Sequence, residues 1–185
     1  IGNLIVSYVE TGEVEKAFTL YERILRELKS QFGEKHLDYL SQQNNYSGFL
    51  YETGFLQKSE DEAREFEKNY RESFDTLAVS YARILGNLGV ICAEKKQLDS
   101  ALMLQTRALR VYEKVLGKGS YEYAITLYGL SCDFQQTGRI DTAIILAKQA
   151  IALLRENGMG DTPLAARILM HLVEISTNQH EYNAA

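Results

Sequence analysis

Asparagine side chains recur at one spacing in the first half of this sequence. Asn3, Asn45 and Asn87 stand 42 residues apart. A primary amide carries donors and acceptors together, so a single asparagine can hydrogen-bond the C=O and N–H groups of a peptide without reading its sequence. Amides at this spacing could form a ladder of hydrogen-bonding groups if a repeated structure brings them to one face.

Residues that usually perform catalysis or bind metals show no comparable pattern. The two cysteines, Cys92 and Cys132, stand 40 residues apart without a CxxC motif or a nearby histidine pair. This spacing fits neither a disulfide framework nor a zinc site, so we expect reduced, intracellular thiols. Of the three histidines, His36 is expected to have a structural role in a loop and His180 to lie in a solvated turn. We therefore expect no enzyme activity, no cofactor and no metal.

A gapless repeat of 42 residues organises the chain. One column of the repeat contains only small residues, as is needed where the two helices of a hairpin cross closely. Its members are Ala17, Ser59, Ala101, Ala143 and Ala185. Three further columns should pack between helices. They are Ile24, Phe66, Ala108 and Ala150; then Phe32, Phe74 and Leu116; then Tyr39, Tyr81 and Tyr123.

Each repeat is predicted to be a helical hairpin. First helices are expected near residues 1–11, 36–52, 78–94, 120–136 and 162–178. Second helices are expected near 14–31, 56–73, 98–116 and 140–157, with another beginning near 182. Gly12, Gly54 and Gly138 follow first helices, where a left-handed residue ends a helix at low cost. One hairpin cannot bury its apolar face alone, so the hairpins must stack.

The repeat also predicts the domain organisation. We expect a single domain over residues 1–185, with repeats near 1–35, 36–77, 78–119 and 120–161 and a truncated fifth from 162. The chain begins and ends inside hairpins, which is typical of a piece of a longer protein. The charged run of residues 60–68 is expected on a solvated second-helix surface.

Composition narrows the classes of partner. The chain has 185 residues, 45% of them hydrophobic, and a net charge of -5. A mildly acidic chain lacks the basic footprint of a nucleic-acid-binding protein. No apolar run approaches the roughly 20 residues that cross a bilayer. We expect neither a nucleic acid nor a membrane as partner, and a cytoplasmic location.

The loops between repeats resemble a known family. Residues 111–120 read VYEKVLGKGS, and residues 32–36 read FGEKH. These stretches resemble the loop motif of the kinesin light chain type of tetratricopeptide repeat (TPR), whose unit is eight residues longer than the usual 34. Asn3–Leu4 and Asn87–Leu88 are similar to the NNLA stretch of the same repeats.

The resemblance implies an all-α, right-handed superhelical solenoid of antiparallel helix hairpins whose first helices line a concave groove for extended peptides. It implies that Asn3, Asn45 and Asn87 hold the ligand's backbone; the alternative is that these amides are solvated. Gly129 and His171 replace asparagine in the later repeats, so we expect the ladder to end there. Other groove positions in this register are Asn44, Tyr51, Glu52, Arg83, Val90, Glu94 and Tyr128. Gly48 and Gly86 either leave room for a ligand or relieve crowding between helices.

Two functions follow from the resemblance. The first is an adaptor that binds a protein or peptide in the groove. The second is a regulatory or sensor arm that contacts the rest of its own longer chain or a sister subunit. Glu10, Glu52 and Glu94 form an acidic stripe, against which Arg83 and Arg167 are the basic groups. We therefore expect a neutral, apolar or basic ligand.

Overall fold

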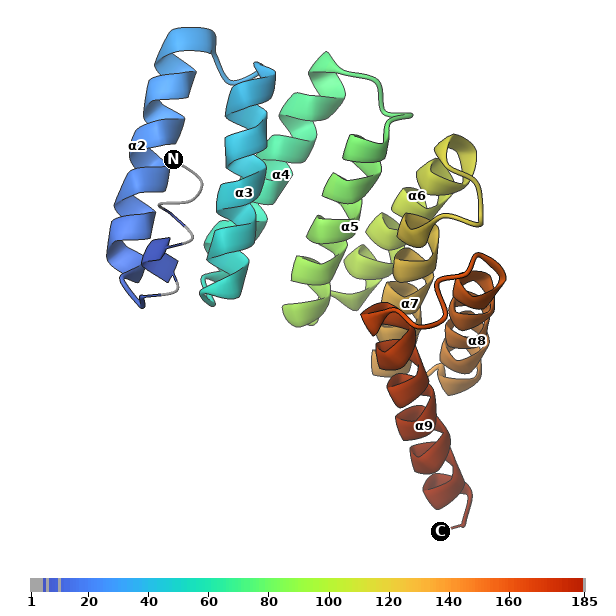
Figure 1. Cartoon of the computed structure of the whole chain (residues 1–185). Coiled ribbons are helices and arrows are strands. Elements are labelled where there is room, and N and C mark those ends of the chain that lie inside the picture. The colour runs from blue at the N-terminus through green and yellow to red at the C-terminus, as the bar shows by residue number, and fades with distance from the viewer. Residues whose placement is uncertain (1–4, 6, 10, 185) are drawn as a thin grey trace. The chain divides into compact units, whose positions relative to one another are not determined.

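The computed structural model describes residues 5, 7–9 and 11–184, with side chains described up to residue 177. These residues contain helices and turns but no strand (Figure 1). The chain divides into two compact units, Ile1–Asp75 and Thr76–Ala185. The predicted all-α class of stacked helix hairpins is confirmed, while Asn3 and Glu10 lie outside the described residues.

The first unit contains three complete helices. Residues 5 and 7–9 are helical, and α2 (Val14–Phe32), α3 (Leu37–Glu52) and α4 (Leu56–Ser73) follow. Helix α3 packs against both α2 and α4. Phe18 and Tyr21 of α2 contact Tyr46 and Phe49 of α3, with ring centroids 5.2 to 5.8 Å apart. This aromatic cluster joins one repeat to the next.

The second unit contains two hairpins and a further helix. The first hairpin is α5 (Val79–Glu94) with α6 (Leu98–Val115), and the second is α7 (Tyr121–Gln136) with α8 (Ile140–Glu156). Helix α6 also packs against α7, and α8 packs against α9 (Pro163–Ala184). The predicted helix bounds agree with these to within one or two residues, except at α9.

Helix α9 departs from the predicted pattern. We expected a turn at His180 and a new helix near 182, but α9 continues through Ala184. The other first helices end where the chain turns back into a second helix. Only five residues of the sequence follow His180, too few to form a helix that packs back on α9. Nothing then offsets the cost of breaking α9 at a residue that disfavours the left-handed conformation.

The turns within hairpins confirm the predicted glycines. Gly12, Gly54 and Gly138 have φ of 76°, 85° and 76°. In each turn the residue after the glycine donates its N–H to a carbonyl five residues earlier, as from Phe55 to Leu50 at 2.8 Å, which is the Schellman arrangement. Lys96 takes the same position in the third repeat with φ 61°, where glycine would be unstrained.

The small-residue column lies at the closest approach of each hairpin's helices. Ala17, Ser59, Ala101 and Ala143 are completely buried. In the second repeat Ser47 Oγ donates to the Ser59 carbonyl oxygen at 3.0 Å, and Ser59 Oγ donates to that of Ser47 at 2.8 Å. In the fourth repeat Ser131 Oγ donates to the Ala143 carbonyl oxygen at 2.7 Å. Small side chains therefore let each helix reach the other's backbone.

Two of the three larger columns behave as predicted. The column of Ile24, Phe66, Ala108 and Ala150 is buried, as is that of Tyr39, Tyr81 and Tyr123. Burial beside Glu65, Glu62 and Glu34 raises the pKa of Tyr39 to about 12. The prediction for the remaining column is wrong, since Phe32 is 45% and Leu116 42% exposed. These residues stand at or just past helix ends, where the loop turns away, and Phe32 instead stacks on His36.

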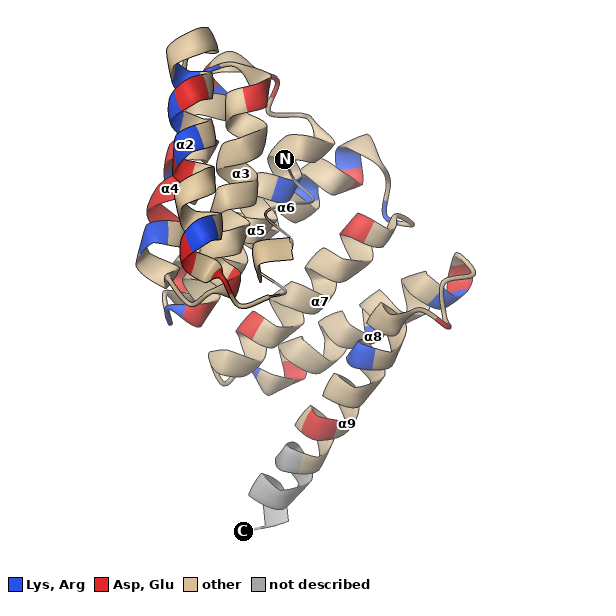
Figure 2. Cartoon of the chain, turned by 60° about the vertical axis from the view of Figure 1, so that its left-hand side comes forward, with Lys and Arg blue, Asp and Glu red and all other residues tan. Residues whose placement is uncertain are grey.

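The charged run of α4 is only partly a solvated surface. Figure 2 shows charged residues crowded on α2 and α4. Glu60, however, is only 4% exposed, and Arg64 bonds its carboxylate at 2.6 Å. Glu62 is half-buried and accepts a hydrogen bond from Gln43 at 3.1 Å, and burial raises the pKa of this carboxyl. The helix period turns these two glutamates of the run inward while Asp61 stays exposed.

The small-residue column should be intolerant of bulk. Ala101→Leu or Ala143→Leu inserts three carbons where no space exists, so each should lower the free energy of unfolding by about 1–3 kcal/mol. Ala152→Leu, at an exposed position of α8, is the matched control. Urea unfolding followed by circular dichroism measures the difference. Equal stability of the three variants would contradict the packing described for this column.

The left-handed turn residue of the third repeat offers a reciprocal test. Lys96→Gly removes the strain of φ 61° and should raise the free energy of unfolding by about 0.5–1 kcal/mol, despite losing the exposed bond from Lys96 Nζ to Gln136. Gly138→Lys, one repeat later, should lower it by about 1 kcal/mol. A Cβ at Gly138 would meet no atom within 4 Å, so the loss would report backbone strain alone. The same unfolding experiment applies, and a destabilised Lys96→Gly would contradict this account.

Candidate functional site

The predicted groove positions of the first unit lie on α3. Asn45 and Glu52 are exposed, and Asn44 and Tyr51 are half-buried. The Asn45 amide makes no hydrogen bond to another residue in the described part of the chain, so its donors and acceptors face solvent. Helix α3 buries its opposite side through Leu40, Gln43 and Ser47. The amphipathic division of one helix thus leaves these polar groups accessible.

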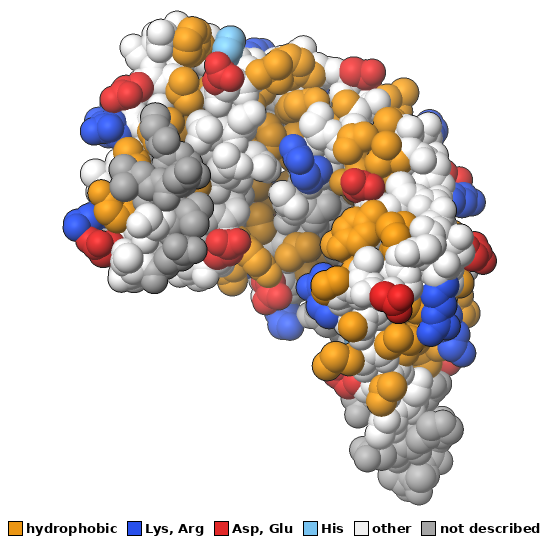
Figure 3. Space-filling view, in the orientation of Figure 1, with side chains coloured by type: hydrophobic (Ala, Val, Ile, Leu, Met, Phe, Trp, Pro, Cys, Tyr) orange, Lys and Arg blue, Asp and Glu red, His pale blue; other side chains and the backbone are white. Residues whose placement is uncertain are grey.

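In the second unit the corresponding positions form what we call the first-helix face of α5, α7 and α9. On α5, Arg83, Asn87, Val90 and Glu94 are exposed. The positions in the same register on the later helices are Ile125, Tyr128, Cys132 and Gln136 on α7 and Arg167, Met170 and Glu174 on α9. Three apolar members are well exposed: Val90 at 41%, Ile125 at 36% and Met170 at 72%. Figure 3 shows apolar side chains interspersed with charged ones over these helices.

Two kinds of glycine occur on the first helices. A Cβ added at Gly48 or Gly86 would meet no atom within 4 Å, so these glycines do not relieve crowding between helices. That alternative is wrong, and both positions leave open space at the surface. Gly89 and Gly129 differ, because a Cβ there would lie 2.7 Å from Cγ and 2.3 Å from Oε1 of Gln105. These two glycines accommodate the Gln105 side chain.

Gln105 belongs to a buried polar pair that the sequence analysis missed. Its Nε2 donates to Asp133 Oδ2 at 2.8 Å, joining α6 to α7, and the two residues are 3% and 2% exposed. Burial raises the pKa of Asp133 to about 7, far above the value of about 3.9 in a free chain. One signal could have revealed the pair: Asp133 occupies a column otherwise held by Phe49, Ile91 and Ile175.

His171, which replaces asparagine in the ladder column, is an interior residue at 8% exposure. Its Nε2 lies 3.2 Å from Ser131 Oγ and 4.0 Å from Cys132 Sγ, and its ring meets that of Tyr128 edge-on at 5.5 Å. Burial lowers the pKa of His171 and raises that of the Cys132 thiol. A neutral thiol beside a neutral imidazole is suited to packing rather than to nucleophilic attack.

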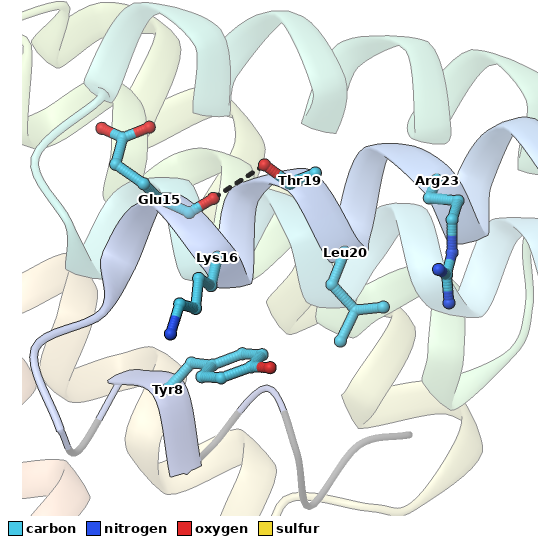
Figure 4. A pocket seen from close by; sticks show the side chains of 6 residues that line it. All are labelled: Tyr8, Glu15, Lys16, Thr19, Leu20 and Arg23. Carbon is cyan, nitrogen blue, oxygen red and sulfur yellow. Dashed lines mark hydrogen bonds between the residues drawn. The ribbon is translucent and has the colours of Figure 1, made fainter.

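Other hollows and clusters lie away from the first-helix face. A surface cavity of about 420 Å³ is lined by residues of α2 and the helical turn before it (Figure 4). They are Tyr8, Glu15, Lys16, Thr19, Leu20 and Arg23. None of these is a predicted site residue. Among the described residues there is no group of three His, Cys, Asp or Glu side chains that could hold a metal. No described helix is long and apolar enough to span a membrane.

Comparisons with known proteins identify the repeat. Residues 80–156 match the tetratricopeptide repeat family. The comparison with curated proteins gave no match. The predicted tetratricopeptide-type repeat is thereby confirmed for these residues, which span α5 to α8.

Solved structures with kinesin light chain-like repeats have the same fold. The putative kinesin light chain nearly identical TPR-like repeats of Podosopora anserina are similar with a TM-score of 0.82 and 15% identity, over 98% of this chain and 86% of that chain. A substituted form of the same repeats gives a TM-score of 0.84 at the same identity and coverage. BtubC (BKLC) from P. vanneervenii gives 0.82 and 17% identity, over 97% of this chain and 72% of that chain. Arrays of this fold generally serve as protein–protein interaction modules.

The buried Asp133 predicts a pH dependence of stability. Its pKa in the folded state lies above that in the unfolded state, so the folded protein holds a proton that the unfolded chain releases. The unfolding free energy should therefore fall as pH rises from about 4 to about 7, by on the order of 3 kcal/mol, and stay low above pH 7. Asp133→Asn keeps an oxygen for Gln105 Nε2 and should remove this contribution, making the variant the more stable protein at pH 8.

The measurement is urea unfolding of wild type and Asp133→Asn between pH 5 and pH 8. The difference between the two proteins isolates Asp133 from His171, whose lowered pKa acts in the opposite direction. Asp99→Asn, at an exposed position in the first turn of α6, is the control and should shift stability by a pH-independent amount. A pH-independent difference for Asp133→Asn would contradict a carboxyl buried in this way.

Proposed function

We propose that this chain is a protein-binding adaptor that holds an extended peptide along its first helices. The observation that carries the proposal is the first-helix face of the second unit, where Val90, Ile125 and Met170 are exposed beside the Asn87 amide. Apolar side chains exposed in one register on three successive first helices offer contacts to a ligand that crosses them. The tetratricopeptide-type fold, generally an interaction module, supports the same function.

Peptide backbone recognition is the second part of the proposal. The exposed amides of Asn45 and Asn87 can donate and accept at once, which suits an extended segment whose own backbone groups are unpaired. Asn3 holds the same place in the repeat. The open space at Gly48 and Gly86, on the same helices as these amides, leaves room for a ligand. The ligand's backbone would supply affinity, and its side chains would supply specificity.

The charges of this face bear on the ligand's chemistry. Glu52 and Glu94 are exposed in one column, to which Glu10 also belongs. Arg83 and Arg167 are the basic members of the face, and Glu174 stands on the same helix as Arg167. An excess of carboxylates repels an acidic peptide, so the proposed ligand is neutral, apolar or basic. Neither a nucleic acid nor a membrane is part of this proposal.

The proposed adaptor is not an enzyme and needs no cofactor. The Cys132–His171 pair, the nearest approach to a catalytic group on this face, is held neutral by burial. Both cysteines are thiols, which supports the cytoplasmic location included in the proposal.

A peptide-library screen on the folded chain tests the proposed function. Peptides with apolar or basic residues should be enriched, and enrichment of peptides rich in Asp and Glu would contradict the proposed ligand chemistry. An enriched peptide should bind the triple variant Asn3→Ala, Asn45→Ala and Asn87→Ala roughly tenfold to a thousandfold more weakly, because each amide bond contributes about 0.5–1.5 kcal/mol. Gln149→Ala removes an exposed amide from the second helix α8 and is the matched control. Unchanged binding by the triple variant would rule out the asparagine ladder.

A further inference from the structure

One side of α9 carries an apolar stripe that is exposed. Leu169 is 38% and Val173 68% exposed, and Ala166 is exposed as well. These residues follow one another at intervals of three and four, so they lie along one side of the helix. The stripe is separate from the first-helix face, to which Met170 belongs, and the inference drawn from it is independent of the proposed function.

The repeat shows what covers this stripe elsewhere in the chain. The residues in the same register on α3, α5 and α7 are Leu40, Ala82 and Ala124; Gln43, Leu85 and Leu127; and Ser47, Gly89 and Ser131. All nine are buried. The helix that buries them is the second helix of the same hairpin, since α3 packs on α4, α5 on α6 and α7 on α8. In each hairpin this stripe faces the small-residue column, as the bond from Ser131 Oγ to the Ala143 carbonyl demonstrates.

We propose that the stripe of Ala166, Leu169 and Val173 binds an amphipathic α-helix of a partner protein, antiparallel to α9, in the position that α6 takes on α5 and α8 takes on α7. The surface continues a mode of packing that occurs in every complete hairpin of the described chain, so its shape already matches a helix. It is apolar and without charge along its length, which excludes a ligand held chiefly by ion pairs.

The register also constrains the partner's sequence. At the crossing point the earlier hairpins place Ser47, Gly89 or Ser131 opposite Ser59, Ala101 or Ala143. Helix α9 places Val173 there, which is larger than any of the three. The partner helix needs glycine at the residue opposite Val173 for the two backbones to approach as closely. Around that glycine it needs apolar residues at helical spacing, and a polar outer side.

A synthetic peptide of residues 140–156 with Ala143→Gly is a suitable probe, because it carries the α8 sequence with glycine at the crossing point. Binding of the fluorescently labelled peptide to the whole chain would be measured by anisotropy. The same peptide carrying Ala147→Asp in addition is the control probe, since Ala147 is completely buried where α8 packs. The first peptide should bind and the second should not.

Variants of α9 locate the binding surface. Leu169→Glu and Val173→Glu each place a charge on the stripe and should weaken binding of the probe on the order of tenfold or more. Met170→Glu adds the same charge to the same helix on the first-helix face and should leave the probe's affinity unchanged. All three positions are exposed, so circular dichroism should show wild-type folding in each.

Three outcomes would overturn the proposal: no binding of the probe, equal binding by all variants, or an equal loss with Met170→Glu. Self-association of the wild-type chain that Val173→Glu abolishes in sedimentation experiments would assign the stripe to a second copy instead. Failure of the library screen described above would leave these results unaffected, because that screen probes the first-helix face. The two surfaces are therefore tested separately.

Discussion

The close approach of two helices within each hairpin is the constraint on which the rest of the structure depends. At the crossing point a side chain of the first helix meets the backbone of the second, as Ser47 meets Ser59 and Ser131 meets Ala143. The residues at these crossings are completely or almost completely buried and small. Because the backbones approach so closely there, the larger residues on either side interdigitate, and the hairpin presents a defined pair of surfaces for stacking.

A second consequence of the crossing appears between α6 and α7. Glycine at positions 89 and 129 leaves a channel that the Gln105 side chain fills, and its amide reaches Asp133 across the hairpin boundary. A buried carboxyl with one hydrogen-bonding partner stabilises the fold less than an apolar residue would. The pair instead restricts how the two repeats can pack, since any shift would leave both groups without a partner. The apolar contacts at the equivalent place in the first unit, between Tyr21 and Phe49, carry no such restriction.

Periodicity explains why so much of the fold could be predicted from the sequence. Helix bounds, left-handed glycines and the small-residue column depend on local chemistry repeated every 42 residues, so one repeat corrects the interpretation of another. The exposure of Phe32 and Leu116 could not be predicted in this way, because matching chemistry in a column does not reveal on which side of a helix end the chain turns. Gln105 and Asp133 were missed for a related reason: they depart from their columns, and their contact spans 28 residues between different repeats.

The candidate site is less predictable than the fold because surface positions experience no packing constraint. Each first helix divides its residues between those that meet the second helix and those that meet solvent, so the exposed residues can vary while the hairpin remains intact. Asn45, Asn87 and Gly129 share one column, yet only the glycine has a packing role, beside Gln105. In the same column His171 is drawn into the interior by Ser131 and Tyr128. A position that faces solvent in one repeat thus becomes part of the core in another, and this exchange requires no change in the backbone. The fold therefore constrains where a ligand can be held, while the identity of the exposed side chains in each repeat decides what is held there.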